Sequence, residues 1–369
     1  MPIPHTPGDR LALIASARRA MLGGTGEDAA ALEPWVEKSW RRCLASGQRP
    51  GQRLGFDMIS REARERMLEA NRPLLTAARP VLERLTRALA TTRYFAILTD
   101  QRGIVLDAQG PIDHSDRQAE LITRIGADLS EGAVGTTAIG AALTELRPVW
   151  LHRGEHFFDD TSVYSCAGAP LFGPDGACIG MLDLTGINAA ERPELKHLVA
   201  QSARSIENAM TLGLSRALLL RLNWPGCAPG GEDDGLVCLD GDGWVTGSNQ
   251  AARQMLPQLA LRGAPTHYSE LFAQPWESLF DMARHGVPPA ASELPLWSGL
   301  RLQVMPQSGE KPGAGAASRV PLRAIEIAMI RKAVADARGN VMQAAQALGI
   351  SRATVYRKLW RGRGGGSTN

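Results

Sequence analysis

A chain of 369 residues with 44% apolar and only 5% aromatic residues is too long for one ordinary domain and can supply two or three separate cores. The net charge is +3, but the segment from Arg319 to Arg363 carries ten Lys and Arg against Glu326 and Asp336, a local +8 that leaves −5 on the rest. An acidic body with a basic C-terminal end indicates a sensor or scaffold that carries a nucleic-acid-binding module, and a solvated basic tail is the alternative reading of the charge alone.

Cysteine usage and hydropathy indicate the compartment. The five cysteines are scattered and form no C-x-x-C pair, which supports neither a disulfide framework nor a zinc knuckle. The first residues lack the basic and apolar run of a signal peptide, and no stretch reaches the roughly 18 apolar residues of a membrane helix. We therefore expect a cytoplasmic protein without a membrane segment, metal or cofactor.

Residues 1–90 are predicted to form a helical N-terminal region. Apolar residues recur at helical spacing over Leu11 to Met21 and over Glu33 to Leu44, followed by a Gly/Pro-rich break over 47–55. Ser60 is expected to open another helix. Pro80 is expected in the first turn of a helix that runs to Leu89.

Residues 91–190 are predicted to form an antiparallel sheet with helices on one side, an α+β sensor-like domain. Short apolar runs separated by turns mark the strands, which are Tyr94 to Thr99, Ile104 to Leu106, Pro148 to Leu151, Cys166 to Phe172 and Cys178 to Leu184. Thr137 to Leu143 is a short helix candidate.

Residues 191–223 are predicted to form a connecting amphipathic helix, because apolar residues line one stripe from Arg192 to Leu222. This stripe packs either on its own domain or on a second subunit, and we prefer the second subunit. Residues 232–305 are predicted to form a smaller α+β unit, and residues 306–320 a flexible linker without an apolar face.

Residues 321–363 carry the most specific pattern. A helix from Pro321 is expected to stop at Gly339-Asn340, a second short helix covers Val341 to Leu348, and Ser351 caps a third helix over Arg352 to Trp360. A helix, a tight turn and a second helix is the spacing of a helix-turn-helix.

The exposed face of the third helix has the composition needed to enter a DNA major groove. Arg352 is placed to reach a guanine edge in a bidentate fork, and Thr354 to contact phosphate or a thymine methyl group. Arg357 and Lys358 are expected to neutralise phosphates. The candidate DNA-binding residues are Ser351, Arg352, Thr354, Tyr356, Arg357 and Lys358.

Two resemblances follow from these motifs. Gly339-Asn340 and the run from Ala344 to Leu359 resemble the Fis-type helix-turn-helix, which implies dimerisation and binding of two recognition helices to double-stranded DNA. The runs Ser39 to Leu44, Gly135 to Gly140, Glu155 to Phe157, Cys166 to Phe172 and Gly180 to Gly186 resemble the GAF domain of the acetoin/glycerol-metabolism (AcoR-like) activators. Asp240 to Leu256 is similar to the first half of a PAS domain.

Typical members of that group carry an ATPase domain that acts on RNA polymerase holding sigma-54. Here only fifteen residues separate Met305 from Pro321, and no Lys follows a Gly, so the chain holds no Gly-Lys-Ser/Thr phosphate loop. We expect action without ATP hydrolysis: by recruitment of RNA polymerase, by occlusion of a site, or through a related activator.

The resemblance implies that the GAF-like domain senses a small effector such as a diol, ketol or alcohol. Polar groups among apolar walls are the candidates for a ligand pocket. The candidate ligand-binding residues are Thr136, Thr137, Trp150, His156, Phe157, Cys166 and Asp183. Each has a structural alternative, such as capping of a helix by the two threonines, and a metal or haem site on His152, His156 and Cys166 is a disfavoured alternative.

The sequence thus predicts a multidomain α+β regulator with a GAF-like sensor, a PAS-like unit and an all-α Fis-type DNA-binding end. The leading function is a homodimeric, effector-responsive transcription regulator. The alternative is an interaction partner or antagonist of a full-length sigma-54-dependent activator. We find no paired catalytic carboxylates, nucleophile elbow or metal cluster in the sequence, so an enzyme is disfavoured and no catalytic residue is assigned.

Overall fold

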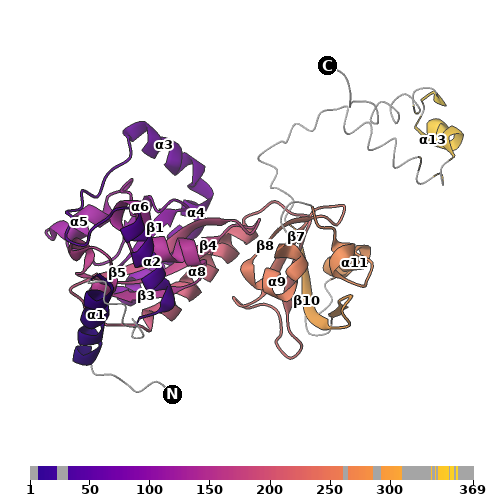
Figure 1. Ribbon diagram of the computed structural model, residues 1–369. Coiled ribbons are helices and arrows are strands. Elements are labelled where there is room, and N and C mark those ends of the chain that lie inside the picture. The colour runs from indigo at the N-terminus through magenta and orange to yellow at the C-terminus, as the bar shows by residue number, and fades with distance from the viewer. Residues whose placement is uncertain are drawn as a thin grey trace. The chain divides into compact units, whose positions relative to one another are not determined.

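The computed structural model describes residues 7–22, 32–260, 265–285 and 292–309, together with 334, 337, 340–348, 350–352 and 355. The chain divides into two compact units, Met1–Glu310 and Lys311–Asn369. The first unit holds two five-stranded antiparallel sheets with their helices (Figure 1). The predicted α+β fold class is confirmed in these two sheets.

Helices α1 (Pro7–Leu22), α2 (Pro34–Ala45), α3 (Arg61–Ala70) and α4 (Arg72–Leu89) precede the first strand. The predicted cap is present, since the Ser60 hydroxyl accepts a hydrogen bond from the Ala63 N–H. The prediction for Pro80 is wrong, because this residue lies inside α4 and Pro73 occupies the first turn. The buried face of α4 continues on both sides of Pro80, and this packing outweighs the roughly 3 kcal/mol cost of an interior proline.

The first sheet has the order β2-β1-β5-β4-β3, with every neighbouring pair antiparallel. Its strands confirm the five predicted runs with small shifts of their ends, and they are β1 (Tyr94–Asp100), β2 (Val105–Gln109), β3 (Val149–His152), β4 (Tyr164–Phe172) and β5 (Cys178–Ile187). Short helices α5 (Arg117–Thr123), α6 (Glu131–Val134) and α7 (Ala138–Glu145) connect them.

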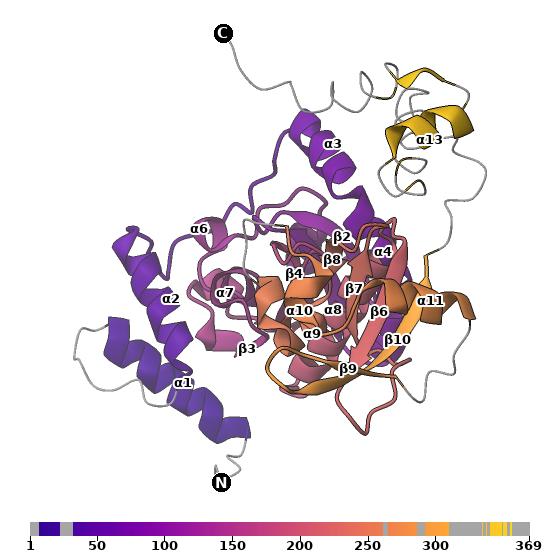
Figure 2. The ribbon, with the colours of Figure 1, turned by 90° about the vertical axis from the view of Figure 1, so that its right-hand side faces the viewer.

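Both faces of the first sheet are covered, so every residue of β1 is buried. Because side chains alternate along a strand, Phe95 and Ile97 join one core with α2 and α7, whereas Ala96 and Leu98 join another with α4 and α8 (Leu195–Leu212). Figure 2 shows α1, α2, α6 and α7 gathered on one side of the first unit. Helices α4 and α8 pack on the opposite face of the sheet, so the expectation of helices on a single side is wrong.

The predicted helix from Arg192 to Leu222 is too long. Helix α8 ends at Leu212, and Leu218–Asn223 forms strand β6 of the second sheet. Leu195, Val199 and Ile206 are buried in the core shared with α4, so the apolar stripe packs on its own sheet and not on a second subunit. The Leu218-Leu219-Leu220 run suits a helix or a strand, and periodicity alone does not separate the two.

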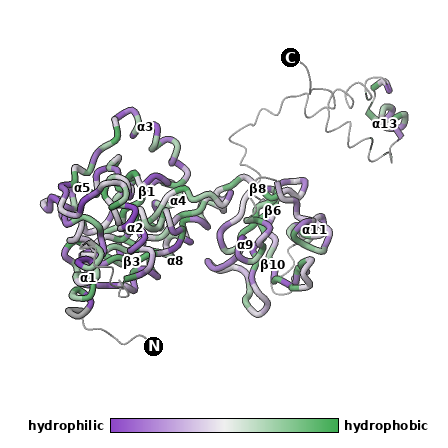
Figure 3. The backbone as a smooth tube through the Cα atoms, viewed as in Figure 1, coloured by the Kyte–Doolittle hydropathy of each residue, from purple (hydrophilic) through white to green (hydrophobic). Residues whose placement is uncertain are grey.

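The second sheet has the order β8-β7-β6-β10-β9. Its other strands are β7 (Gly235–Leu239), β8 (Val245–Ser248), β9 (Glu293–Pro295) and β10 (Arg301–Ser308). Its helices are α9 (Gln250–Met255), α10 (Tyr268–Leu271) and α11 (Glu277–His285). The central strand β6 is a hydrophobic segment (Figure 3). The sheet starts at Leu218 and ends at Ser308, so the expected bounds of 232 and 305 are wrong, and its PAS-like character stays a prediction.

Hydrogen bonds join the two sheets. The Ser248 N–H donates to the Pro174 carbonyl (2.9 Å), which lies in the turn between β4 and β5. The Asn249 amide donates to the Asn208 side chain on α8 (2.7 Å), and the Glu207 carboxylate on α8 accepts from the Phe172 N–H (2.8 Å). The end of α8 and the β4–β5 turn therefore both contact the second sheet.

The second unit is described only in part. Helix α13 (Val341–Ala347) begins at Asn340, whose side-chain oxygen accepts from the Met342 and Gln343 N–H groups at 3.2 Å each. Asn340 therefore caps the second predicted helix. Ala345 and Val355 are buried together. The first predicted helix and most of the third lie outside the described residues.

None of the helices that the structure describes has the length and apolar character needed to cross a lipid bilayer.

Replacement of Gly180 on β5 tests the close approach of the central strands. A Cβ at this position would lie 2.2 Å from the Thr99 carbonyl oxygen, which is backbone and cannot turn away. We expect Gly180→Ala to lower the free energy of unfolding by about 1–3 kcal/mol, measured by chemical denaturation. Gly241→Ala is the control, because nothing lies within 4 Å of its Cβ position, and equal losses in both variants would contradict this packing.

Candidate functional site

A small cavity lined by buried residues lies against the first sheet. Its volume is about 30 Å³, room for one or two water molecules. Side chains from β1, β4 and β5 line one wall, and α5, α7 and the loop after β3 line the other. The lining includes four of the seven candidate ligand-binding residues, Thr137, His156, Cys166 and Asp183.

His156 reaches this cavity from the loop of residues 153–161, which we call the His156 loop. The imidazole is fully buried, and its Nδ1 lies 2.9 Å from the Arg153 carbonyl oxygen, so Nδ1 carries the proton and donates. Burial lowers the pKa of His156 to about 4. The neutral ring therefore leaves Nε2 as an acceptor, and this atom is buried without a hydrogen-bond partner.

Asp183 supplies the second unsatisfied polar atom. Its Oδ2 accepts from the Thr185 hydroxyl, while Oδ1 is buried without a partner. Burial raises the pKa of Asp183 to about 7, and the Thr185 hydrogen bond opposes this shift. Near pH 7 the carboxyl group therefore exchanges between a charged form, which only accepts hydrogen bonds, and a protonated form, which also donates one.

Cys166 and Thr137 complete the polar lining. The Cys166 sulfur lies 3.4 Å from the Thr185 hydroxyl, and burial raises the pKa of this thiol, which keeps it protonated. Thr137 caps α7, because its hydroxyl accepts from the Gly140 N–H at 3.2 Å. Thr137 therefore has the helix-capping role expected as its alternative to ligand binding, and its side chain also lines the cavity.

The other three candidates lie away from the cavity lining. The Thr136 hydroxyl faces α2, 2.6 Å from that of Ser39. Phe157 packs edge-on against Phe158, and Trp150 stacks on His152 and lines a different pocket, together with Arg10 and Trp35. Four of the seven candidate residues therefore line one cavity and three do not, and their role in ligand binding stays a prediction.

Sequence reasoning missed three polar residues of the cavity. Thr185, Tyr164 and Thr161 all line it. Thr185 follows Asp183 by two positions on β5, and Tyr164 precedes Cys166 by two on β4, so strand alternation places each pair on one face. That signal was available for Thr185 and Tyr164, whereas Thr161 lies in a loop without periodicity.

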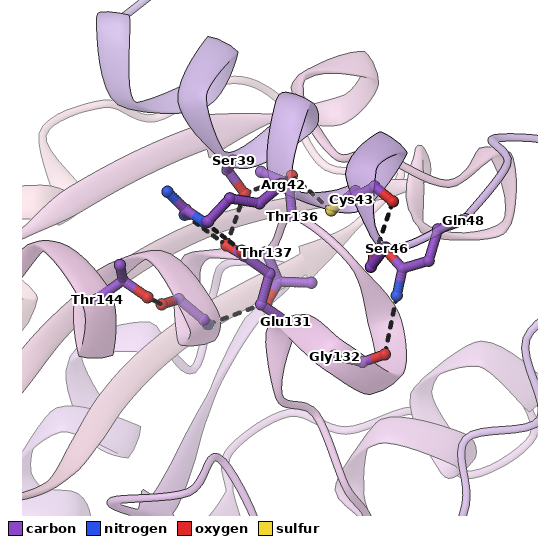
Figure 4. Close-up of polar contacts among 11 residues, drawn as sticks. Ser39, Arg42, Cys43, Ser46, Gln48, Glu131, Gly132, Thr136, Thr137 and Thr144 are labelled. Atoms are coloured by element: carbon purple, nitrogen blue, oxygen red, sulfur yellow. Dashed lines mark hydrogen bonds and ion pairs between the residues drawn. The ribbon is translucent and has the colours of Figure 1, made fainter.

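Polar contacts attach α2 to the segment before α7 (Figure 4). The Arg42 guanidinium makes a two-bond ion pair with Glu131, at 2.6 and 2.8 Å. The Ser39 hydroxyl contacts Glu131 at 2.7 Å as well as Thr136, and the Gln48 amide donates to the Gly132 carbonyl at 2.8 Å. The motif Ser39 to Leu44 therefore serves to hold the cavity wall.

Across the described residues, no three His, Cys, Asp or Glu side chains gather closely enough to hold a metal ion. His152, the third group of the disfavoured metal or haem site, is instead engaged through its Nδ1 with the Ser165 hydroxyl at 2.8 Å.

The candidate DNA-binding residues are described in part. Ser351 and Arg352 are exposed, and Arg352 is helical. The Val355 N–H donates to the Ser351 carbonyl at 3.2 Å, the first turn of the third predicted helix. Thr354, Tyr356, Arg357 and Lys358 lie outside the described residues.

Comparison with known proteins places these parts in families. The family model described as MimR, N-terminal domain, matches residues 15–208, more than half of the chain. The chain belongs to this family. A second model, described as bacterial regulatory protein, Fis family, matches residues 321–361. The chain is therefore a DNA-binding regulator of the Fis type, and its resemblance to acetoin-type activators is confirmed at this level.

Curated relatives agree with the two models. The acetoin catabolism regulatory protein of Cupriavidus necator is 32% identical over 261 residues, which cover 67% of this chain and 37% of the relative. The acetoin dehydrogenase operon transcriptional activator AcoR of Bacillus subtilis is 29% identical over 50% of this chain and 30% of its own length. The chain thus matches about a third of the length of these relatives.

A solved structure, that of the E. coli DhaR(N)–DhaL complex, matches with a TM-score of 0.46 and 16% identity, covering 75% of this chain and 93% of that one.

Substitution of Asp183 tests its raised pKa. The folded protein holds this proton up to a pH of about 7, whereas an unfolded aspartate releases it near pH 3.8, so Asp183 makes stability fall as pH rises through this window. His156 acts in the opposite sense, because the unfolded imidazole takes up a proton near pH 6.5 and the folded one near 4, which lowers stability as pH falls.

We expect Asp183→Asn to remove the first effect alone. As the pH is raised from 4 to 8, the unfolding free energy of the variant should rise by about 2–4 kcal/mol relative to that of the unsubstituted chain. The measurement is chemical denaturation of both proteins at each pH. The exposed Glu120→Gln serves as the control. Parallel pH profiles for the Asp183 variant and the unsubstituted chain would contradict the assignment.

Proposed function

We propose that this chain is a dimeric transcription regulator that binds double-stranded DNA through its Fis-type end and a small hydroxyl-bearing metabolite through the cavity of the first sheet. It acts without ATP hydrolysis of its own, because the printed sequence contains no Gly-Lys-Ser/Thr loop. A bacterial regulator of this type works where the chromosome lies, so we place it in the cytoplasm.

The observation that carries the ligand proposal is the pair of unsatisfied atoms in the cavity, His156 Nε2 and Asp183 Oδ1. Buried polar atoms without partners cost about 1–3 kcal/mol each, and a ligand that pairs with them recovers this free energy. Nε2 accepts from a hydroxyl, and the carboxyl group of Asp183 pairs with a hydroxyl or a carbonyl. A diol, ketol or alcohol has these groups, and the acetoin regulators among the relatives support this class.

Ligand binding requires the cavity to enlarge. Ligand sites for drug-sized molecules have volumes of about 300–1,000 Å³, and a four-carbon metabolite still needs several times the present 30 Å³. The walls made of β1, β4 and β5 are fixed by ladder hydrogen bonds. The opposite wall, made of short helices and the His156 loop, is the side that moves.

The alternative function is an interaction partner or antagonist of a full-length activator. The match to about a third of the length of the relatives supports it, because a chain that shares the N-terminal domain and the DNA-binding end can occupy the same operator or form mixed dimers. Specific operator binding by the purified chain alone would favour the first function. Binding that appears only with an added activator would favour the second.

Metabolite binding is tested with acetoin, 2,3-butanediol and 2-propanol, each added to the full chain and followed by isothermal titration calorimetry. We expect at least one to bind. His156→Leu should weaken binding by about tenfold or more, since one buried hydrogen bond is lost. His114→Leu, at an exposed histidine, should bind as the unsubstituted chain does. No binding by any of the three compounds would remove this ligand class.

Arg352 tests the DNA-binding assignment. A bidentate contact to guanine distinguishes one base, so Arg352→Ala should reduce specific binding by about 1–3 kcal/mol and relax base preference at one position of each half-site. Lys358→Ala should weaken all sequences alike and reduce the salt slope by about one unit. Competition binding with base-substituted operators is the measurement, and equal losses on specific and random DNA for Arg352→Ala would refute its role.

A further inference from the structure

The His156 loop forms its own hydrogen bonds within single turns, from the His156 N–H to the Arg153 carbonyl (2.9 Å) and from the Thr161 N–H to the Phe158 carbonyl (3.1 Å). It consists of two single turns, η1 (Arg153–Glu155) and η2 (Asp159–Thr161), between strands β3 and β4. Arg153 has a φ of 48°, a left-handed backbone conformation that costs a non-glycine residue about 1–3 kcal/mol. Such a conformation persists only where surrounding contacts hold it.

Residues 50–54 supply some of those contacts, since the Asp159 N–H donates to the Pro50 carbonyl (2.9 Å) and the Asp160 carboxylate accepts from the Leu54 N–H (3.0 Å). Side chains from the N-terminal helices supply the contacts to residues 154–157. The carbonyl groups of four consecutive loop residues, 154 to 157, accept hydrogen bonds from outside the loop. Arg18 on α1 donates to the carbonyls of Gly154 (3.3 Å), His156 (2.6 Å) and Phe157 (2.7 Å). The Trp40 indole on α2 donates to the carbonyl of Glu155 at 2.9 Å.

Further contacts fasten the same two helices to the loop. Arg10 on α1 pairs with the buried Glu155 carboxylate at 2.9 Å, and Arg18 also pairs with Asp159 at 2.8 Å. Ile14 is buried, and its side chain lies so close to Gly154 that a Cβ there would be 3.2 Å away. The Arg18 guanidinium lies over the Trp40 ring, 5.7 Å from its centroid. Arg18 therefore joins α1, α2 and the loop at one point.

We propose that α1 is the gate of the cavity: Arg18 holds the His156 loop shut, and the cavity opens when α1 releases the loop. This inference rests on the proposed function, because it makes the sensing cavity accessible only through a movement of the N-terminal helix. It also assigns Arg18 as a positioning residue, since its three carbonyl bonds fix the backbone that aims His156 inward. Ligand binding then favours the open loop, whereas the contacts of α1 favour the closed loop. A ligand in the cavity therefore releases α1 from the loop.

Cys166 provides a test that needs no ligand. This thiol lines the cavity and is buried, so we expect its reaction to become faster when the cavity opens, whereas Cys238 is buried in the second sheet and reports opening elsewhere. Alkylation of the full chain by iodoacetamide is followed at each cysteine by peptide mass spectrometry. Loss of charge-assisted carbonyl bonds in Arg18→Met should raise the Cys166 rate by about tenfold or more and leave the Cys238 rate unchanged.

Three variants make the result decisive. Arg19→Met alters the exposed neighbouring arginine and should leave Cys166 as protected as in the unsubstituted chain. Arg18→Lys keeps the charge without the fork and should give an intermediate rate. Gly180→Ala weakens the same sheet away from the loop, and it should raise the Cys166 rate less than Arg18→Met does for an equal loss of stability.

The gate is overturned if Arg18→Met leaves the Cys166 rate unchanged, raises the Cys238 rate equally, or has no more effect than Gly180→Ala at matched stability. Because no metabolite is present, failure of the gate is distinguishable from failure of the proposed ligand class, which the calorimetric titration measures separately.

Discussion

The His156 loop places backbone carbonyls at the surface of the first sheet where no neighbouring strand can pair with them. A buried carbonyl without a partner costs as much as a lost hydrogen bond, so some other group has to donate. Arg18 and Trp40 do so, and this requirement brings α1 and α2 onto the sheet. The position of His156, the closure of the cavity and the packing of the N-terminal helices all depend on these donors.

The cavity is the second consequence of that arrangement. With the loop held in place, the imidazole of His156 is buried opposite strands that carry Cys166 and Asp183, and two polar atoms are left without partners. An unsatisfied pair of this kind is costly for folding and useful for recognition, because the free energy it forfeits is available to a ligand of matching shape. The raised pKa of Asp183 and the lowered pKa of His156 have the same main cause, burial of both groups in the protein interior.

Strands and short-range caps were largely predictable from the sequence, while long-range contacts were not. Apolar runs between turns gave all five strands of the first sheet, and Ser60 and Thr137 were recognisable caps. Alternation along β5 pairs Asp183 with Thr185, a local signal. Nothing local connects Arg18 with residues about 140 positions away, and the Leu218 to Leu220 run has no period that identifies it as a central strand. Thr136 was misplaced because its rotation toward α2 depends on Ser39, a partner that sequence distance conceals.

The turn at Pro174 connects the strands that carry Cys166 and Asp183, and its carbonyl receives the N–H of Ser248 in the second sheet. The β4–β5 hairpin therefore lines the cavity partway along its length and contacts the second sheet at its turn. Because ladder hydrogen bonds fix β4 and β5, this hairpin holds the second sheet in place while the opposite wall of the cavity moves. The length of β4 and β5, and not only the identity of their residues, therefore determines how far the second sheet lies from the cavity.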